Sequence, residues 1–107
     1  MITCTFEKGF TASLRHVVVH AIVEMDGKLL LGKRTGDILE TDKWGLPSGF
    51  LDRDETAEEG TLRELKEETG WEGKIISLFR IVTRPDRPHE DRQNVSFVYL
   101  VMPRACR

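Results

Sequence analysis

The segment between Thr56 and Gly70 carries start and stop signals for an α-helix, and it constrains the fold most strongly. Thr56 is followed three residues later by Glu59, the spacing of a capping box, and Gly70 fits a C-terminal cap. No proline lies between them. The signals predict a helix of about four turns. Because the other apolar segments are strand-like, this helix must pack on a sheet, so we expect an α+β domain with a mixed sheet.

The segments before the helix indicate paired strands. Residues 15–24 are rich in β-branched residues and too apolar for an exposed strand, so we expect them inside a sheet. Asp26-Gly27 supplies a hairpin turn, and residues 28–34 are predicted to return as the partner strand. Residues 35–43 are polar and predicted to form a loop. Residues 44–49 are too rich in Gly and Pro for regular structure, and lead into a short extended piece at 50–52.

Two further strands are predicted after the helix. Residues 74–83 are apolar and indicate a second buried strand, and residues 94–102 indicate a last strand. Between them, residues 85–93 form a polar segment with two prolines, which predicts a loop.

Composition limits the class of partner. A chain of 107 residues, 39% hydrophobic and 32% charged, is expected to form one domain over residues 1–107. No stretch approaches the roughly 20 apolar residues of a membrane span. Residues 1–8 lack a secretory signal, so we expect a cytoplasmic protein. A net charge of −2 offers no general attraction to nucleic acid, so a small-molecule partner is favoured over nucleic acid or a membrane.

The predicted helix places three carboxylates on one face. Glu64, Glu67 and Glu68 lie at i, i+3 and i+4. Such a trio repels itself, and the helix dipole disfavours anions near the C-terminal end. A divalent cation would offset the repulsion, because carboxylate oxygens are ligands that Mg²⁺ prefers. Spacing alone favours a solvated acidic face paired with Arg63 and Lys66, because Glu-rich helices are common.

The sequence around this trio resembles the Nudix box, G-x5-E-x7-R-E-U-x-E-E-x-G-U, where U is a bulky apolar residue. All seven fixed positions match: Gly49, Glu55, Arg63, Glu64, Glu67, Glu68 and Gly70. At typical residue frequencies such a match arises by chance about once in 10⁸. The resemblance extends over roughly residues 16–103. Two departures are Trp71 at the last position and Gly60-Thr61 in place of small helix-formers; Gly60 would cost about 1 kcal/mol in an exposed helix interior.

The resemblance implies roles for the matched residues. Glu64, Glu67 and Glu68 correspond to metal-binding carboxylates, and the Gly49 carbonyl to a backbone ligand, with Mg²⁺ or Mn²⁺ as the metal. Arg63 and Glu55 correspond to the pair that orients the acidic side chains. The implied fold is the family's α/β/α sandwich around a mixed sheet. The implied chemistry is attack of a metal-activated water on a diphosphate.

The resemblance implies hydrolysis of a nucleoside diphosphate linked to another moiety. Pro85 and Pro88 are similar to prolines of the ADP-ribose-cleaving branch, which favours an ADP-ribose-like substrate. The alternatives are a pyrophosphohydrolase acting on a nucleoside triphosphate or an RNA end, and a non-catalytic domain that binds a nucleotide.

Several residues outside the box are candidates for contacting the substrate. Lys33 and Arg34 end a predicted strand and could contact phosphate, and Trp44 could stack on a base or sugar or simply fill a turn. Glu90 or its neighbour Asp91 could accept the water's proton, or could only solubilise the loop. His16 and His20 lie about 13 Å apart along a strand, too far to ligate one metal.

The C-terminal end predicts an uncovered sheet face. Only five residues follow the predicted strand 94–102, too few for the helix that usually covers the second face in the family. An exposed apolar patch of several hundred Å² is unusual for a monomer. We therefore expect a homodimer that buries this face, or aggregation of a C-terminally short domain. The alternative is that residues 1–10 fold partly over the gap.

Overall fold

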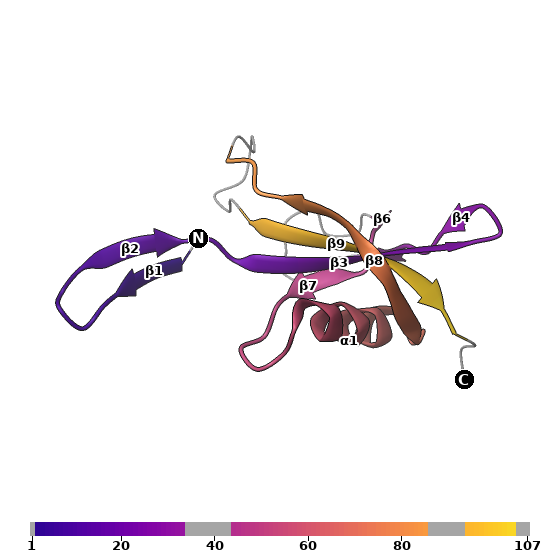
Figure 1. The fold of residues 1–107 in the computed structure, drawn as a ribbon, viewed down its shortest axis with the longest axis horizontal. Helices are drawn as coiled ribbons and strands as arrows, with labels where there is room; N and C mark the ends of the chain where they lie inside the picture. Colours follow the sequence, from indigo (N-terminus) through magenta and orange to yellow (C-terminus); the bar gives the residue numbers. More distant parts are fainter. Residues whose placement is uncertain (1, 34–43, 86–93, 105–107) are drawn as a thin grey trace.

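A computed structural model describes residues 2–33, 44–85 and 94–104 of the chain. Within these ranges one helix and a set of strands follow one another along the chain (Figure 1). Their bounds are β1 Ile2–Thr5, β2 Thr11–Leu14, β3 Val17–Met25, β4 Lys28–Leu29, β5 Gly32–Lys33, β6 Trp44–Gly45, β7 Ser48–Phe50, α1 Ala57–Thr69, β8 Gly73–Val82 and β9 Val95–Pro103.

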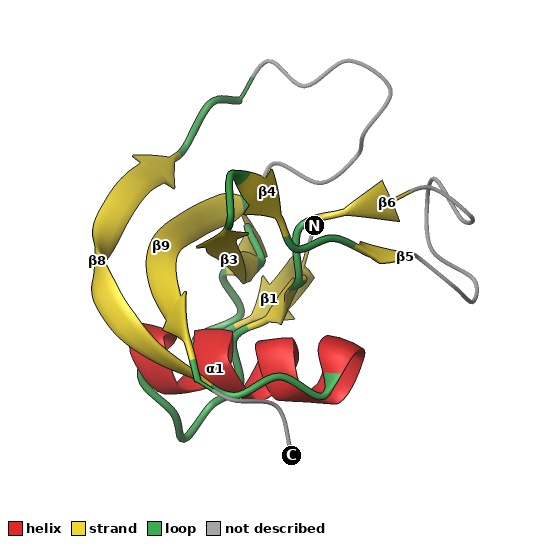
Figure 2. Cartoon of the chain, turned by 90° about the vertical axis from the view of Figure 1, so that its right-hand side faces the viewer, coloured by secondary structure: helices red, strands yellow, loops and turns green. Residues whose placement is uncertain are grey.

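The central sheet is mixed, as the sequence predicts. Its strand order is β4-β3-β9-β8, and β7 also pairs with β3. Strands β3 and β9 are parallel, with Val17 opposite Val95, whereas the other pairings in this sheet are antiparallel. Helix α1 lies against one face of the sheet (Figures 1 and 2). The α+β class is therefore confirmed, with the helical layer of the described residues on one side.

The core lies between α1 and the two parallel strands. In β3, Val19, Ala21 and Val23 are buried on one face, because side chains of a strand point to opposite faces with a period of two, and Val18 on the other face is buried as well. Leu65 of α1 and Val101 of β9 are also buried in the core, at 0% and 2% exposure. The box leucine therefore fixes which face of α1 meets the sheet.

The predicted helix ends are confirmed. Thr56 caps the N-terminus in a complete capping box with Glu59, and Gly70 ends the helix in the left-handed conformation at φ 77°. The expectation for Gly60 is wrong, because this residue is buried. A Cβ there would lie 2.8 Å from Glu55 Oε1 and 2.9 Å from Leu51 Cδ1.

The expected partner strand at 28–34 is broken in the structure. Only β4 pairs with β3, whereas β5 pairs with β6 as a separate ribbon in which Gly32 lies opposite Gly45. Leu30 still donates its backbone N–H to the Val23 carbonyl at 2.9 Å and packs against the core, so the chain leaves the sheet after this residue. Residues 44–45, expected to be irregular, are thus a short strand. The extended piece expected at 50–52 lies slightly earlier, as β7 Ser48–Phe50.

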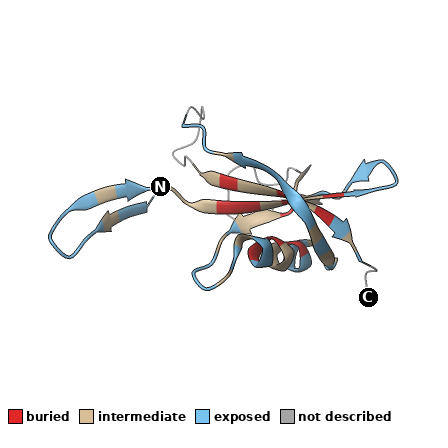
Figure 3. Ribbon diagram, viewed as in Figure 1, coloured by how far each residue is buried: buried red, intermediate tan, exposed pale blue. Residues whose placement is uncertain are grey.

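Strand β8 exists as predicted but is not buried. Large apolar side chains are exposed along it: Ile76 56%, Leu78 45%, Phe79 55% and Ile81 47%. The strand lies at the edge of the sheet, and its register with β9 is irregular between Ile75 and Ser77 and again between Leu78 and Arg80. Figure 3 shows β8 as largely exposed ribbon above α1.

The N-terminal segment forms a hairpin of its own. Strands β1 and β2 pair antiparallel as a separate two-stranded sheet, with Gly9 at φ 82° in the turn. The hairpin points away from the body of the molecule (Figure 1), and Phe6 and Phe10 are 52% and 70% exposed. The alternative that residues 1–10 fold over the open face is therefore wrong.

Candidate functional site

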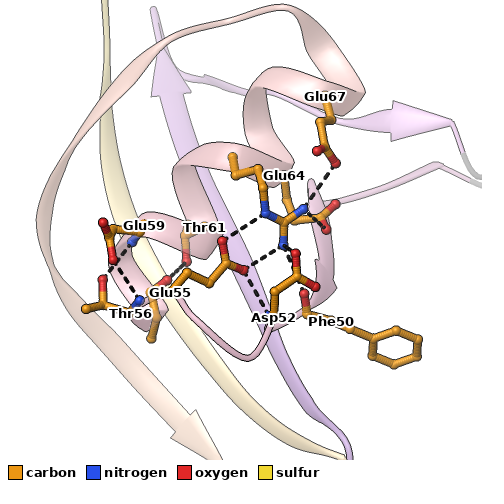
Figure 4. A network of polar contacts seen from close by, with 10 residues as sticks. Phe50, Asp52, Glu55, Thr56, Glu59, Thr61, Glu64 and Glu67 are labelled. Atoms are coloured by element: carbon orange, nitrogen blue, oxygen red, sulfur yellow. Dashed lines mark hydrogen bonds and ion pairs between the residues drawn. The ribbon is translucent and has the colours of Figure 1, made fainter.

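Arg63 of α1 is the centre of a polar network between the helix and the loop before it. Its Nε and Nη2 donate to Glu55 at 2.9 and 2.7 Å, and Nη2 also donates to the Phe50 carbonyl at 3.1 Å. Its Nη1 donates to Glu64 at 2.8 Å and to Glu67 at 3.1 Å. Figure 4 shows these groups converging on the guanidinium. The pair expected from the sequence, Arg63 and Glu55, is therefore in direct contact.

Glu55 is held as a carboxylate. The hydrogen bonds from Arg63, and after them that from the Asp52 backbone N–H at 2.9 Å, lower the pKa of Glu55 to about 2 against the opposing effect of burial. Because Glu55 lies one residue before the N-cap, its fork-like contact with Arg63 joins the loop to the helix.

Glu64 lies in a different environment from Glu55. Burial raises the pKa of Glu64, the bond from Arg63 opposes this, and the charges of Glu67 and Asp52 raise it again. Its carboxylate also fills the space beside Gly49 of β7. A Cβ on Gly49 would lie 2.2 Å from Glu64 Cδ, so only glycine fits this position without displacing Glu64.

Glu68 is held by the backbone of β7. Its Oε2 accepts a hydrogen bond from the Ser48 N–H at 3.1 Å. A Cβ on Gly32 of β5 would lie 3.8 Å from the same oxygen. Glu68 therefore lies between β7 and the β5–β6 ribbon. Its contact residue Ser48 precedes Gly49, the residue against which Glu64 packs.

The donor set fits a hard divalent cation in type. Carboxylate and carbonyl oxygens suit Mg²⁺ and Mn²⁺, and the missing Cβ of Gly49 lets β7 approach the helix carboxylates. Within the described part of the chain, no three His, Cys, Asp or Glu side chains already stand in a metal-holding arrangement. Instead, Glu64 and Glu67 accept hydrogen bonds from Arg63, and Glu68 accepts one from the Ser48 backbone N–H.

Comparison with known proteins agrees with this geometry. The sequence model of the NUDIX domain matches residues 14–105. The chain belongs to the Nudix family. An ADP-ribose pyrophosphatase of Methanocaldococcus jannaschii is 44% identical over 71 residues, which are 66% of this chain and 41% of that protein. A CTP pyrophosphohydrolase of Escherichia coli is 38% identical over 58 residues, 54% of this chain and 43% of that protein.

Solved Nudix structures share the fold. The crystal structure of a MutT Nudix hydrolase from Burkholderia pseudomallei superimposes with a TM-score of 0.73 at 31% identity, over 89% of this chain and 76% of that one. The chain spans less than half the length of the two curated relatives named above. The described residues include no helix long and apolar enough to cross a membrane.

The candidates outside the Nudix box are only partly described. Lys33 and Trp44 lie opposite each other in the β5–β6 ribbon, which passes beside Glu68, and the structure describes only their backbone. Arg34, Glu90 and Asp91 lie outside the described residues.

The remaining predicted and observed features lie apart from the carboxylates. His16 stacks on the Phe50 ring, with centroids 4.7 Å apart. A cavity of about 270 Å³ is lined by Val23, Met25, Asp26, Lys28, Leu29, Leu30 and Trp71. None of these residues belongs to the predicted site.

Sequence reasoning missed three partners of the network. Asp52 lies with Oδ2 3.5 Å from Arg63 Nη2, the Phe50 carbonyl accepts from the same nitrogen, and the Ser48 N–H holds Glu68. Two of these are backbone groups, whose roles no residue type reveals. Asp52 carried a weak signal as an acid three residues before Glu55.

Proposed function

We propose that this single Nudix domain, residues 1–107, belongs to a metal-dependent hydrolase that cleaves the diphosphate linkage of a nucleoside diphosphate joined to another moiety. The observation that carries the proposal is the arrangement around Arg63. One guanidinium draws Glu64 and Glu67 together, while Gly49 leaves room for Glu64 against β7. A merely solvated acidic face would need neither the glycine nor the arginine fork.

Each residue of the network has a proposed role. Glu64, Glu67 and Glu68, with the Gly49 carbonyl, are the metal-holding groups, and Arg63 and Glu55 orient them. Bound there, Mg²⁺ or Mn²⁺ would neutralise diphosphate charge and lower the pKa of a water nucleophile.

The remaining roles concern the substrate and the proton. Lys33, Arg34 and Trp44 would contact the substrate, because the β5–β6 ribbon passes beside Glu68. The water's proton would pass to one of the three carboxylates, or to Glu90 or Asp91.

An ADP-ribose-like compound is the proposed substrate. The support is the ADP-ribose pyrophosphatase among the relatives, together with Pro85 and Pro88 beyond the box. The CTP pyrophosphohydrolase relative supports the second candidate, removal of pyrophosphate from a nucleoside triphosphate. Incubation with ADP-ribose and CTP in Mg²⁺ or Mn²⁺ separates the two, because the first yields AMP and ribose phosphate and the second CMP and pyrophosphate. Binding without turnover of any nucleotide in such a panel would favour a non-catalytic domain, and turnover in excess chelator would refute the metal mechanism.

The position of attack can be tested by isotope. Attack of water on phosphorus places oxygen-18 from labelled water in a phosphate product. Label in a hydroxyl group of free ribose, released together with unlabelled ADP, would point to attack at carbon and contradict the proposed roles.

We also propose that the chain associates as a homodimer and is cytoplasmic. The support for association is the exposed apolar surface of β8 and of the β1–β2 hairpin, since an isolated hairpin is at best marginally stable in water. The cytoplasmic location accords with a small nucleotide substrate, and cell fractionation would check it.

A further inference from the structure

The guanidinium of Arg63 has a full set of partners. An arginine offers five N–H donors. Nε–H and one Nη2–H go to Glu55, the other Nη2–H goes to the Phe50 carbonyl, and the two Nη1–H groups go to Glu64 and Glu67. Three of the donors therefore anchor the side chain to the loop, and only Nη1 faces the helix carboxylates.

The two acceptors of Nη1 are proposed metal ligands. Carboxylate oxygens that carry a divalent cation have less charge to offer an N–H donor, and a second cation beside the first is repelled. Anchored by Glu55 at 2.7 and 2.9 Å, the guanidinium cannot simply leave the site.

We propose that Arg63 competes with the divalent cation for Glu64 and Glu67, acting as a built-in counter-charge that metal binding must displace from these two carboxylates. The inference rests on the proposed function and deepens it. Arg63 then limits metal affinity while reducing repulsion between the carboxylates. If Arg63 only oriented the ligands, its removal would weaken metal binding, so the two roles predict changes of opposite sign.

The loop supplies a further anionic neighbour for the guanidinium. Asp52 Oδ2 lies 3.5 Å from Nη2, its side chain is 67% exposed, and it is close enough to Glu64 to raise that group's pKa. A guanidinium displaced from Glu64 and Glu67 can thus keep an anionic neighbour without leaving Glu55.

The test measures binding of Mn²⁺ itself, without substrate. Calorimetric titration of Arg63→Gln should give a dissociation constant at least about threefold lower than that of the natural chain, because a positive charge next to the ligands is removed. Lys66→Gln is the matched control. It removes the same charge from the same helix, but Lys66 contacts Glu72 at 3.3 Å rather than the proposed ligands. An unchanged or higher dissociation constant for Arg63→Gln, or an equal gain for Lys66→Gln, would overturn the proposal.

A second measurement uses the natural chain and so does not depend on the variant folding. In heteronuclear NMR of the arginine side chains, assigned with Arg63→Lys, saturating Mg²⁺ should shift or broaden the Nη signals of Arg63 and leave its Nε–H signal nearly unchanged. Unchanged Nη signals at saturation would contradict displacement.

The outcomes also separate this inference from the proposed function. Mn²⁺ binding that is lost in Glu68→Gln but not tightened in Arg63→Gln defeats the competition alone. A natural chain that binds no Mn²⁺ defeats the proposed metal site, and the competition with it.

Discussion

The loop–helix region, residues 48–70, and the outer strand β8 are built on opposite principles. In the first, Arg63 has all five donors paired within the segment, and the helix is capped by its own residues. In the second, side chains such as Ile76 and Phe79 are more than half exposed, at 56% and 55%. The polar groups of the first region find their hydrogen-bond partners within the segment, whereas the apolar side chains of β8 would be buried only by another surface.

This difference indicates that the polar contacts of the loop–helix region serve the proposed catalysis, whereas the exposed side chains of β8 serve the proposed assembly. Close polar contacts position groups to within a fraction of an ångström, which chemistry requires. The hydrophobic effect is non-directional, so exposed apolar side chains indicate only that another surface is expected to cover them. Substitutions in the polar network of the loop–helix region should therefore alter activity far more than stability, and substitutions of the exposed side chains on β8 should alter neither in the isolated chain.

The largest effect is expected for Glu68→Gln. The substitution removes one ligand charge but keeps the shape of the side chain, so we expect the fold to persist and kcat to fall by about a hundredfold or more. The matched control is Glu72→Gln, an exposed carboxylate that contacts Lys66 rather than the site. Steady-state kinetics at saturating Mg²⁺ measure both. Full turnover by Glu68→Gln would remove this residue from the proposed metal ligands.

Gly49→Ala should have the next largest effect. Its Cβ would meet Glu64 Cδ at 2.2 Å, so the carboxylate must move, and we expect kcat to fall about tenfold to a hundredfold. Gly32→Ala is the control, because its Cβ would lie at an ordinary 3.8 Å from Glu68 Oε2. Equal activities for the two variants would mean that the close approach at Gly49 has no role in catalysis.

Local signals in the sequence predicted the loop–helix region well. The capping box and the glycine cap are confirmed, because each depends on residues within one segment. The Arg63–Glu55 pair, which the Nudix resemblance implied, is in contact at 2.7 Å. The close approach of Gly49 to Glu64 could not be predicted in geometry, since it depends on how β7 lies against α1.

The errors concern properties set by distant parts of the chain. The apolar pattern predicted β8 as a buried strand, whereas its exposure depends on whether another layer covers the sheet, which is the point of the expected uncovered face. The expected 28–34 strand divides into two pieces that pair with different strands, β4 with β3 and β5 with β6, and this depends on where those distant partners lie. Tyr99 donates to Glu58 at 2.9 Å across 41 residues of sequence, a contact that no local pattern contains.

That contact predicts an alkaline loss of stability. Burial, and after it Glu58 as hydrogen-bond acceptor and neighbouring negative charge, together raise the pKa of Tyr99 from its ordinary 10.0 to about 12. The folded chain therefore holds the proton more tightly than the unfolded chain. The resulting stabilisation is complete below pH 10.0 and is lost as pH rises to about 12, by up to about 3 kcal/mol.

Tyr99 is the single tyrosine of the chain, so tyrosinate absorbance reports it directly. Native protein should titrate well above protein in urea, and Tyr99→Phe should remove this part of the pH dependence of unfolding. Coincident titration curves in the native and unfolded states would show that the Glu58 contact does not stabilise the neutral phenol.

The smallest effect on the isolated chain is expected for the double variant Ile76→Thr and Ile81→Thr on β8. Both side chains are about half exposed, at 56% and 47%, and threonine keeps the β-branching that suits a strand. At low concentration the free energy of unfolding should change by less than about 1 kcal/mol, because little apolar burial is lost. Leu65→Ala, at 0% exposure, should cost about 2–5 kcal/mol under the same conditions.

At micromolar concentration, however, light scattering should show a dimer for the natural chain and weaker association for the double variant. A natural chain that stays monomeric, or a double variant that associates as strongly, would separate the exposure of β8 from assembly and contradict the proposed homodimer.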